Sequence, residues 1–299
     1  MLLKNAGKQS ALAEQESIFA ALKEDHRYAQ VESEDFVFVF DKVLGQPCSI
    51  KRQGRELLTK TGGWNVWRAP TDNDRYIREE WQKAQYPYMR GQVHACQIDY
   101  KEDRVIIQVD EVMAAPVVQP LAHMKTSWNI YPEGRIEVET QVEIDENFPD
   151  LPRFGMRFFL TEGFDAYRYF GYGPYASYTD MRRASHLGIF QSDLEKSYQD
   201  FIMPQEHGSH YDARELVLSD HNLNLHVALQ KGSSFNFSAY SQEELTAKTH
   251  NFLLEKDGPV LCLDYKQNGI GSNSCGPRLM DAYRFKEKTF KFAFVLSLY

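Results

Sequence analysis

After the first thirty residues, the hydrophobic pattern of the chain has a period of two. The clearest example is RIEVETQVEI, which places Ile136, Val138, Val142 and Ile144 on one face and mostly acidic residues on the other. Period two is the repeat of a β-strand, and a polar second face is typical of antiparallel sheets. The pattern therefore predicts an antiparallel β-protein.

The same alternation, or a short apolar run, predicts strands along the rest of the chain. These predicted strands cover residues 35–41, 104–112, 135–144, 154–160, 223–229, 259–265 and 289–298. Turn-forming residues separate them, as in a β-sandwich. We predict an all-β fold built as one large antiparallel β-sandwich.

Only two segments have a helical pattern. The first covers residues 75–84, with Asp74 as its expected N-cap. The second covers residues 241–249, where Ser241 and Glu244 have the spacing of a capping box.

Residues 1–30 differ in composition from the rest, being rich in Ala, Glu, Gln and Leu. We interpret them as a linker or tail, partly helical, outside the core. Residues 31–299 are the predicted domain. The hydrophobic fraction of 42% and aromatic fraction of 13% allow a large core, and aromatic residues suit strands.

Charge and cysteine usage exclude several classes of protein. The net charge of −8 disfavours nucleic acid or an anionic membrane as a partner, since both attract basic surfaces. No apolar run is long enough for a membrane helix, and the first residues lack the apolar stretch of a signal peptide. Cys48, Cys96, Cys262 and Cys275 are scattered, which indicates reduced thiols and a cytoplasmic location.

Motifs for metal or nucleophilic chemistry are weak. The stretch PQEHGSH brings together Glu206, His207 and His210, but a zinc site needs a further ligand in suitable geometry, so we interpret it as a polar loop. TDND lacks the following Gly and the late Glu of a calcium loop. No G-x-S-x-G elbow is present, so the chain offers no metal and no catalytic nucleophile of its own.

Three polar loops stand out against the strands, at residues 67–76, 171–183 and 269–278. The third, within DYKQNGIGSNSCGP, follows an apolar strand and contains three glycines, which permit close backbone approach. It presents Asn273, Ser274 and Cys275 at a strand end. Taken alone, this loop is better interpreted as an ordinary tight turn.

Five stretches occur in a characteristic order: NVWRAPTDND, GYGPYASYTD, PQEHGSHYDARELVL, FNFSAYSQEEL and LDYKQNGIGSNSCGP. Their order and spacing resemble the C-terminal domain of glycoside hydrolase family 2 β-galactosidases, or the small subunit of those β-galactosidases that are split into two chains. The resemblance covers roughly residues 31–299, and its first and last motifs are the specific ones.

The resemblance implies a β-supersandwich similar to galactose mutarotase. It also implies hydrolysis of terminal β-D-galactosides with a partner, because the family's catalytic glutamates lie in a separate (β/α)8 barrel that this sequence lacks. Catalytic residues are therefore expected to be absent from this chain, which would be inactive alone. Magnesium, with sodium as an option, would belong to the complete enzyme and not to this chain.

The resemblance also suggests residues that bind substrate. SNSCGP resembles the segment that lines the aglycone side of the pocket, which makes Asn273, Ser274 and Cys275 candidates. Some relatives have a stacking tryptophan where this chain has Cys275. The GYGPYASYTDM loop lacks residues common in relatives and is not expected to be catalytic.

Arg68, Asp72, Asn73 and Asp74 are further candidates, from the stretch that begins GWNVWRAPTDND. One interpretation is a structural latch: Trp64 or Trp67 anchors the strand, and Arg68 pairs with Asp72 or Asp74 because a charge beside large aromatics needs a partner. The other interpretation is direct contact with sugar.

Two further functions remain open. A free-standing mutarotase-like epimerase would use a histidine acid and a glutamate base, for which Glu206 with His207 or His210 is the candidate. A carbohydrate-binding module would show exposed aromatic platforms. A homo-oligomer also remains open, since a surface normally covered by another part would favour self-association.

Overall fold

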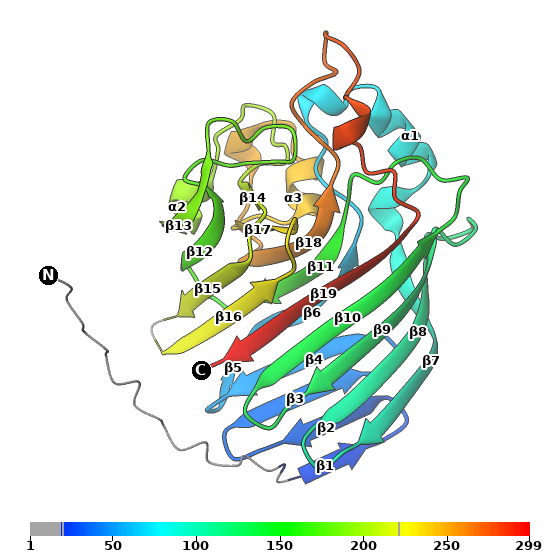
Figure 1. The fold of residues 1–299 in the computed structure, drawn as a ribbon, viewed down its shortest axis with the longest axis vertical. Coiled ribbons are helices and arrows are strands. Elements are labelled where there is room, and N and C mark those ends of the chain that lie inside the picture. Colours follow the sequence, from blue (N-terminus) through cyan, green and yellow to red (C-terminus); the bar gives the residue numbers. More distant parts are fainter. Residues whose placement is uncertain (1–18, 20, 221) are drawn as a thin grey trace, which may run out of the picture.

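The computed structural model describes residue 19, residues 21–220 and residues 222–299. The strands form two layers, and helices and long loops gather at one end of them (Figure 1). None of the helices in these ranges is both long and apolar enough to cross a membrane.

One layer is a nine-stranded antiparallel sheet. In spatial order its strands are β13 (His186–Asp193), β12 (Ala166–Gly173), β15 (Glu215–Asp220), β16 (Leu223–Leu229), β19 (Thr289–Leu298), β10 (Arg135–Ile144), β9 (Ala122–Ile130), β8 (Val105–Ala114) and β7 (Arg90–Tyr100).

The other layer consists of two five-stranded sheets. The first contains β1 (Ala21–Glu24), β2 (Tyr28–Glu32), β3 (Phe36–Asp41), β4 (Gln46–Arg52) and β5 (Arg55–Glu56). The second, in spatial order, contains β14 (Ser209–Tyr211), β17 (Ser234–Ser238), β18 (Val260–Gln267), β11 (Arg153–Leu160) and β6 (Leu58–Asn65). The two sheets meet where β4 contacts β6.

Aromatic residues join the layers into one core. Phe40 of β3 packs edge-on against Trp128 of β9 with ring centroids 5.6 Å apart, and Phe154 of β11 packs against Phe290 of β19 at 5.1 Å. Both five-stranded sheets therefore cover the nine-stranded one. The predicted all-β antiparallel sandwich is confirmed, although one layer is split into two sheets.

Each segment predicted from the hydrophobic pattern is a strand. The other twelve strands of the described residues were not predicted, and β9 is among them although its buried and exposed positions alternate. Some of the missed strands do not display the alternation. In β12, the inward positions of the second half are Gly171 and Gly173, which have no side chain to mark a face. The outermost strand β7 is largely exposed on both faces and so lacks an apolar side.

The predicted tail differs from the structure in its final residues. Residues 21–24 and 28–32 form β1 and β2, and Ala29 is buried, so the sheet begins before the expected boundary at residue 31. The composition of this stretch favours a helix, but pairing of β2 with β3 decides its conformation. The earlier part of the predicted tail, 1–18 and residue 20, lies outside the described residues.

The helices are short: α1 (Ile77–Lys83), α2 (Leu194–Ser197) and α3 (Gln242–Ala247). The predicted role of Asp74 as the N-cap of the first helix is wrong, because Tyr76 occupies that position and the Asp74 carboxylate pairs with Arg68. Four 3₁₀ helices complete the described elements: η1 (Asp72–Asp74), η2 (Tyr86–Tyr88), η3 (Asn251–Leu253) and η4 (Asp281–Tyr283).

The capping box predicted for α3 is half formed. The Ser241 hydroxyl accepts a hydrogen bond from the Glu244 backbone N–H at 3.1 Å. The return bond is absent, because the Ser241 N–H donates to Asp257 and the Glu244 carboxylate accepts from Glu255 N–H. The loop that follows the helix thus provides the partners for the other half of the motif.

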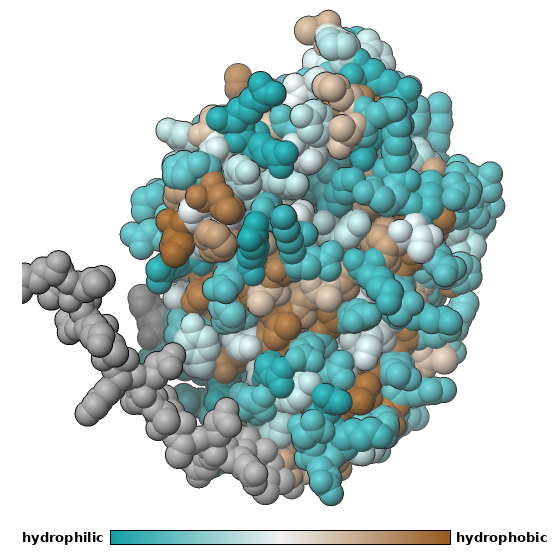
Figure 2. Space-filling model, viewed as in Figure 1, coloured by the Kyte–Doolittle hydropathy of each residue, from teal (hydrophilic) through white to brown (hydrophobic). Residues whose placement is uncertain are grey.

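Figure 2 shows the outer face of the nine-stranded sheet. Polar residues dominate it, while apolar residues gather across its middle. Ala228 of β16 and Ala293 and Val295 of β19 occupy half-buried positions there. The face therefore has mixed character.

Candidate functional site

The three polar loops singled out in the sequence meet in space. The Arg68 guanidinium donates to the carbonyl of Asn268 at 2.5 Å and to that of Gly269 at 3.3 Å. The Asn73 amide donates to the Ile270 carbonyl at 2.6 Å. Residues 67–76 and 269–278, nearly 200 positions apart, are therefore bound directly to each other.

The remaining loop, 171–183, holds the same segment from the other side. One Asp180 carboxylate oxygen accepts from the Ile270 N–H at 3.1 Å, and the other accepts from the Gly271 N–H at 2.7 Å. A side chain at residue 269 would not fit, because a Cβ on Gly269 would lie 2.7 Å from the Asp180 carboxylate carbon. The glycine thus allows the close approach that Asp180 needs.

Arg68 is fully buried, and its charge is paired. It donates to both carboxylate oxygens of Asp74, at 2.7 and 3.1 Å, and lies over the Trp81 ring at 5.3 Å. Asp74 also accepts from the backbone N–H of Thr71. Of the two predicted partners, Asp74 makes the ion pair, whereas exposed Asp72 donates its N–H to Gln205.

Trp67 and Trp81 anchor this segment in the core. Both are buried and pack edge-to-face, with centroids 6.3 Å apart. The Trp81 indole N–H donates to the Asp150 carbonyl at 2.8 Å, which fixes α1 above the loop. The predicted latch is therefore present: aromatic anchors, a buried arginine and its carboxylate partner.

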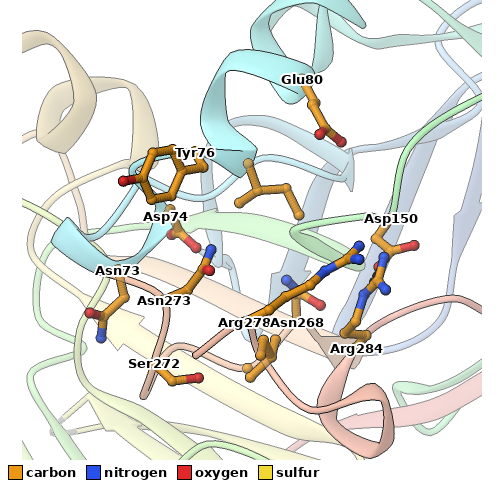
Figure 3. Close-up of a pocket in the computed structure, with 13 residues that line it drawn as sticks. Asn73, Asp74, Tyr76, Glu80, Asp150, Asn268, Ser272, Asn273, Arg278 and Arg284 are labelled. Carbon is orange, nitrogen blue, oxygen red and sulfur yellow. Dashed lines mark hydrogen bonds and ion pairs between the residues drawn. The ribbon is translucent and has the colours of Figure 1, made fainter. Parts of the chain in front are cut away.

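A pocket of about 370 Å³ opens where these segments meet (Figure 3). Its walls come from η1 and α1, from the loop after β18, and from the segments before β11 and β19. The lining residues are Asn73, Asp74, Tyr76, Ile77, Glu80, Asp150, Asn268, Gly269, Ser272, Asn273, Arg278, Leu279 and Arg284.

Most lining residues are polar, but Ile77 and Leu279 add aliphatic surface, and Tyr76 adds one exposed aromatic ring. Asparagine amides both donate and accept hydrogen bonds, and Glu80 offers a carboxylate. Across the pocket from Asn73 and Tyr76 in Figure 3, Arg284 donates to Asp150 at 2.5 Å. Such a mixture of donors, acceptors and one ring suits a ligand rich in hydroxyl groups.

Asn273 has a strained backbone. Its φ of 99° lies in a region that residues other than glycine rarely adopt. Strained residues of this kind cluster at binding and catalytic sites, where the surrounding structure holds them in place. This strained residue lies in the wall of the pocket.

The predicted site residues separate into two groups. Asn73, Asp74 and Asn273 line the pocket, and Arg68 lies behind its wall. The second group, made up of Asp72, Ser274 and Cys275, does not line it, and Cys275 is exposed on the loop. Contact of any of these residues with substrate stays a prediction.

Other residues of the pocket were missed. Tyr76 and Glu80 are four positions apart in the predicted helix, so helical spacing could have placed both on the face next to Asp74. Arg278 ends the 269–278 loop but was not named as a candidate. Asp150 and Arg284 have no local signal, because folding alone brings their segments to this pocket.

Behind the pocket lies a second buried ion-pair network. Arg153 donates to both oxygens of Asp264, at 2.6 and 3.0 Å, and to Glu206 at 3.2 Å. The other Glu206 oxygen has no hydrogen-bond partner among the described residues. Burial raises the pKa of Glu206, against the opposing effect of Arg153 and Arg68. The Glu206 N–H donates to the Ala69 carbonyl, which links this network to the 67–76 loop.

The histidines of PQEHGSH are buried. His207 hydrogen bonds to the Gln205 carbonyl, and His210 lies between Tyr167 and Tyr169, with the Tyr169 hydroxyl 2.8 Å from its Nδ1. Within the described ranges, no group of three or more His, Cys, Asp or Glu side chains is arranged to hold a metal ion. The motif thus forms packing and hydrogen bonds, and its polar groups are directed inward.

We expect His210 to make stability pH-dependent. Burial lowers its pKa from 6.5 to about 4, so the folded state resists protonation. The stability that neutral His210 contributes to the folded state is therefore complete above the unfolded pKa of 6.5 and is lost as pH falls towards 4. This change lowers the free energy of unfolding by about 2 kcal/mol between about pH 7.5 and pH 5. His210→Phe should remove this part of the pH dependence of urea unfolding. The half-exposed control His226→Phe should retain it, and equal pH dependence in both variants would contradict the assignment.

Comparison with known proteins identifies relatives over most of the chain. A family model described as "Beta galactosidase small chain" matches residues 32–296. A β-galactosidase from Actinobacillus pleuropneumoniae is 39% identical over 276 residues, covering 92% of this chain and 27% of that protein. A β-galactosidase from Staphylococcus xylosus is 35% identical over 261 residues, covering 87% of this chain and 26% of that protein. The chain thus spans about a quarter of the length of these relatives.

Among solved structures, the galactose 1-epimerase from Lactobacillus acidophilus NCFM aligns with 95% of this chain and 98% of its own chain. The TM-score is 0.49 and the sequence identity is 8%.

Proposed function

This chain belongs to the β-galactosidase small chain family, and from that premise we propose that it completes the aglycone side of a galactosidase active site. The observation that carries the proposal is the pocket formed where residues 67–76 and 269–278 meet. In this proposal Asn73 and Asn273 hydrogen bond to sugar hydroxyls, and Tyr76 offers its ring to an apolar sugar face.

We propose that the catalytic glutamates lie in a separate (β/α)8 barrel of glycoside hydrolase family 2 type. A glycosidase normally needs two carboxyl groups facing the scissile bond. In the pocket, Asp74 is held by Arg68 and Asp150 by Arg284, which leaves Glu80 as the carboxylate without such a partner among the described residues. This arrangement supports binding without hydrolysis, and we expect the isolated chain to be inactive.

The proposal assigns magnesium, with sodium as an option, to the partner and not to this chain. The described residues do not fit a metal site, since no group of three suitable side chains is present in those ranges. Asp74 and Asp150 are each engaged by an arginine. No step assigned to this chain therefore passes through a metal ion.

The proposed partners are the catalytic barrel, in the same or a separate chain, and a terminal β-galactoside. The mixed outer face of the nine-stranded sheet (Figure 2) and the exposed loop carrying Cys275 are surfaces suited to contact with the barrel. The net charge of −8 supports the absence of nucleic acid and anionic membranes as partners.

The test is hydrolysis of a nitrophenyl-β-galactoside by the purified chain, alone and mixed with the part of the Actinobacillus β-galactosidase that this chain does not cover. We expect no turnover from either piece and activity from the mixture. Turnover by this chain alone would contradict the assignment of the catalytic carboxylates to the partner.

Asp180→Ala sharpens this test. Removing the carboxylate frees two backbone N–H groups of the 269–271 segment, and charge-assisted bonds of this kind justify an expected activity loss of about tenfold in the mixture. Asp103→Ala, in an exposed turn between β7 and β8, is the matched control and should leave activity unchanged. Equal activity of the two variants would show that the pocket loop does not contribute.

A carbohydrate-binding module is the second candidate, favoured by the same hydroxyl-binding chemistry of the pocket. It predicts sugar binding without any gain of hydrolysis on mixing. An epimerase is less well supported, because Glu206 is held by Arg153 and His210 is enclosed by tyrosines, so neither faces the pocket.

A further inference from the structure

A second and larger pocket, of about 580 Å³, lies far from the candidate site. It is formed by the β11–β12 turn, α2 and the segment before β18. The lining residues are Glu162, Gly163, Phe164, Asp165, Leu194, Glu195, Tyr198, Ala239, Tyr240, Lys256, Gly258 and Pro259. We name it the α2 pocket. Its volume is within the roughly 300–1,000 Å³ typical of small-molecule sites.

The two pockets lie at opposite ends of one strand. β18 begins directly after Pro259, which lines the α2 pocket, and ends directly before Asn268, which lines the candidate site. Eight residues of extended chain span about 26 Å. Figure 1 likewise shows α2 and α1 on opposite sides of the molecule. The α2 pocket is therefore a separate site.

Two tyrosines form its aromatic surface. The rings of Tyr198 and Tyr240 are 5.4 Å apart and inclined by 55°, and fully buried Phe164 lies in the wall. Tyr198 also packs edge-to-face on buried His207 at 5.3 Å. The rings are thus held in place and still partly exposed, as a stacking surface must be.

Polar groups without partners surround these rings. Glu162, Asp165, Glu195 and Lys256 line the pocket, and none of these side chains forms a hydrogen bond or ion pair with another described residue. The Tyr240 hydroxyl is likewise without a partner among the described residues. The pocket therefore presents three carboxylates, one ammonium group and one phenol to a ligand.

We propose that the α2 pocket binds a neutral saccharide, independently of the candidate site. The C–H face of a sugar packs on tyrosine rings, while its hydroxyls donate to carboxylates and accept from an ammonium group. Three carboxylates against one lysine repel anionic sugars. Two inclined rings do not enclose an organic cation as an aromatic cage does, so a neutral ligand fits better.

The test is a lactose titration of the full chain and of variants in each pocket, with saturation-transfer NMR as the measure of binding. Tyr240→Ala should weaken lactose binding about tenfold, the value of one stacked ring. Tyr240→Phe keeps the ring and should bind more tightly than the alanine variant. Tyr76→Ala, in the candidate site, is the matched control, and it should keep the lactose binding at the α2 pocket that Tyr240→Ala weakens. Near-UV circular dichroism would confirm that each variant is folded.

Three outcomes would overturn the proposal. They are no lactose binding by the parent chain, unchanged binding by folded Tyr240→Ala, and loss of all binding in Tyr76→Ala. Binding of a short oligolysine peptide that depends on Tyr240, without lactose binding, would instead identify a site for basic peptides. Because the readout is binding to the chain alone, failure here is distinct from failure of complementation.

Discussion

Arg153→Met should lower the free energy of unfolding by about 3–5 kcal/mol, because it leaves two buried carboxylates without their cation. Arg153 has no exposed side-chain surface, and Asp264 and Glu206 are nearly as buried. Methionine keeps most of the side-chain volume, so the loss of stability measures the effect of removing the charge and not the effect of creating a cavity. Urea unfolding at neutral pH, followed by tryptophan fluorescence, measures it.

The loss of stability caused by Arg153→Met should be smaller at acidic pH. Without Arg153, the pKa values of Asp264 and Glu206 rise further in the folded state, so the variant is most stable where both are protonated and loses stability as pH rises through those values. Arg153→Met combined with Asp264→Asn and Glu206→Gln should recover part of the loss at neutral pH.

The matched control is Arg157→Met on the same strand, β11. Arg157 pairs with half-exposed Glu243, and a pair of this kind contributes about 1 kcal/mol or less. Equal destabilisation by the two variants would show that the buried network is no more important than a surface ion pair.

Arg68→Ala should cost about 3–5 kcal/mol and also loosen the pocket. The substitution removes the partner of buried Asp74 and the donors to the carbonyls of Asn268 and Gly269. We therefore expect a lower melting temperature together with faster amide exchange in residues 268–271. Mass-spectrometric hydrogen exchange measures the second effect.

Arg75→Ala is the control for Arg68→Ala. It removes the same charge from the same segment, but Arg75 is exposed, so the change in stability should stay within about 0.5 kcal/mol. If Arg68→Ala melted like Arg75→Ala, the latch interpretation of the contacts around Arg68 would be wrong.

The strands were predictable because their signal is local. Alternation over β10 and β19 follows from one buried and one solvated face, a property that neighbouring residues alone display. Where that signal is absent the prediction failed, as in glycine-containing β12 and in exposed β7. Pairing with β3 decided the conformation of residues 28–32 against their helical composition.

The candidate site was predictable in part. Polar residues packed behind tryptophans pointed to a buried ion pair at Arg68, and the glycines of 269–278 pointed to close backbone approach. Asp180 was named only as part of a loop, since its acceptance of two N–H groups from residues 270 and 271 depends on how the loops meet.

By itself, the sequence determined the all-β class, the positions of seven of the nineteen strands in the described residues, the need of Arg68 for a carboxylate and the family resemblance. Only the tertiary structure decided which carboxylate it was, which loops share a pocket, and that Tyr198 and Tyr240 line a second one at the far end of β18. The physical reason is distance along the chain. Strand alternation and the pairing of Arg68 with Asp74 involve residues close in sequence, whereas a pocket forms where distant segments are packed together by the core.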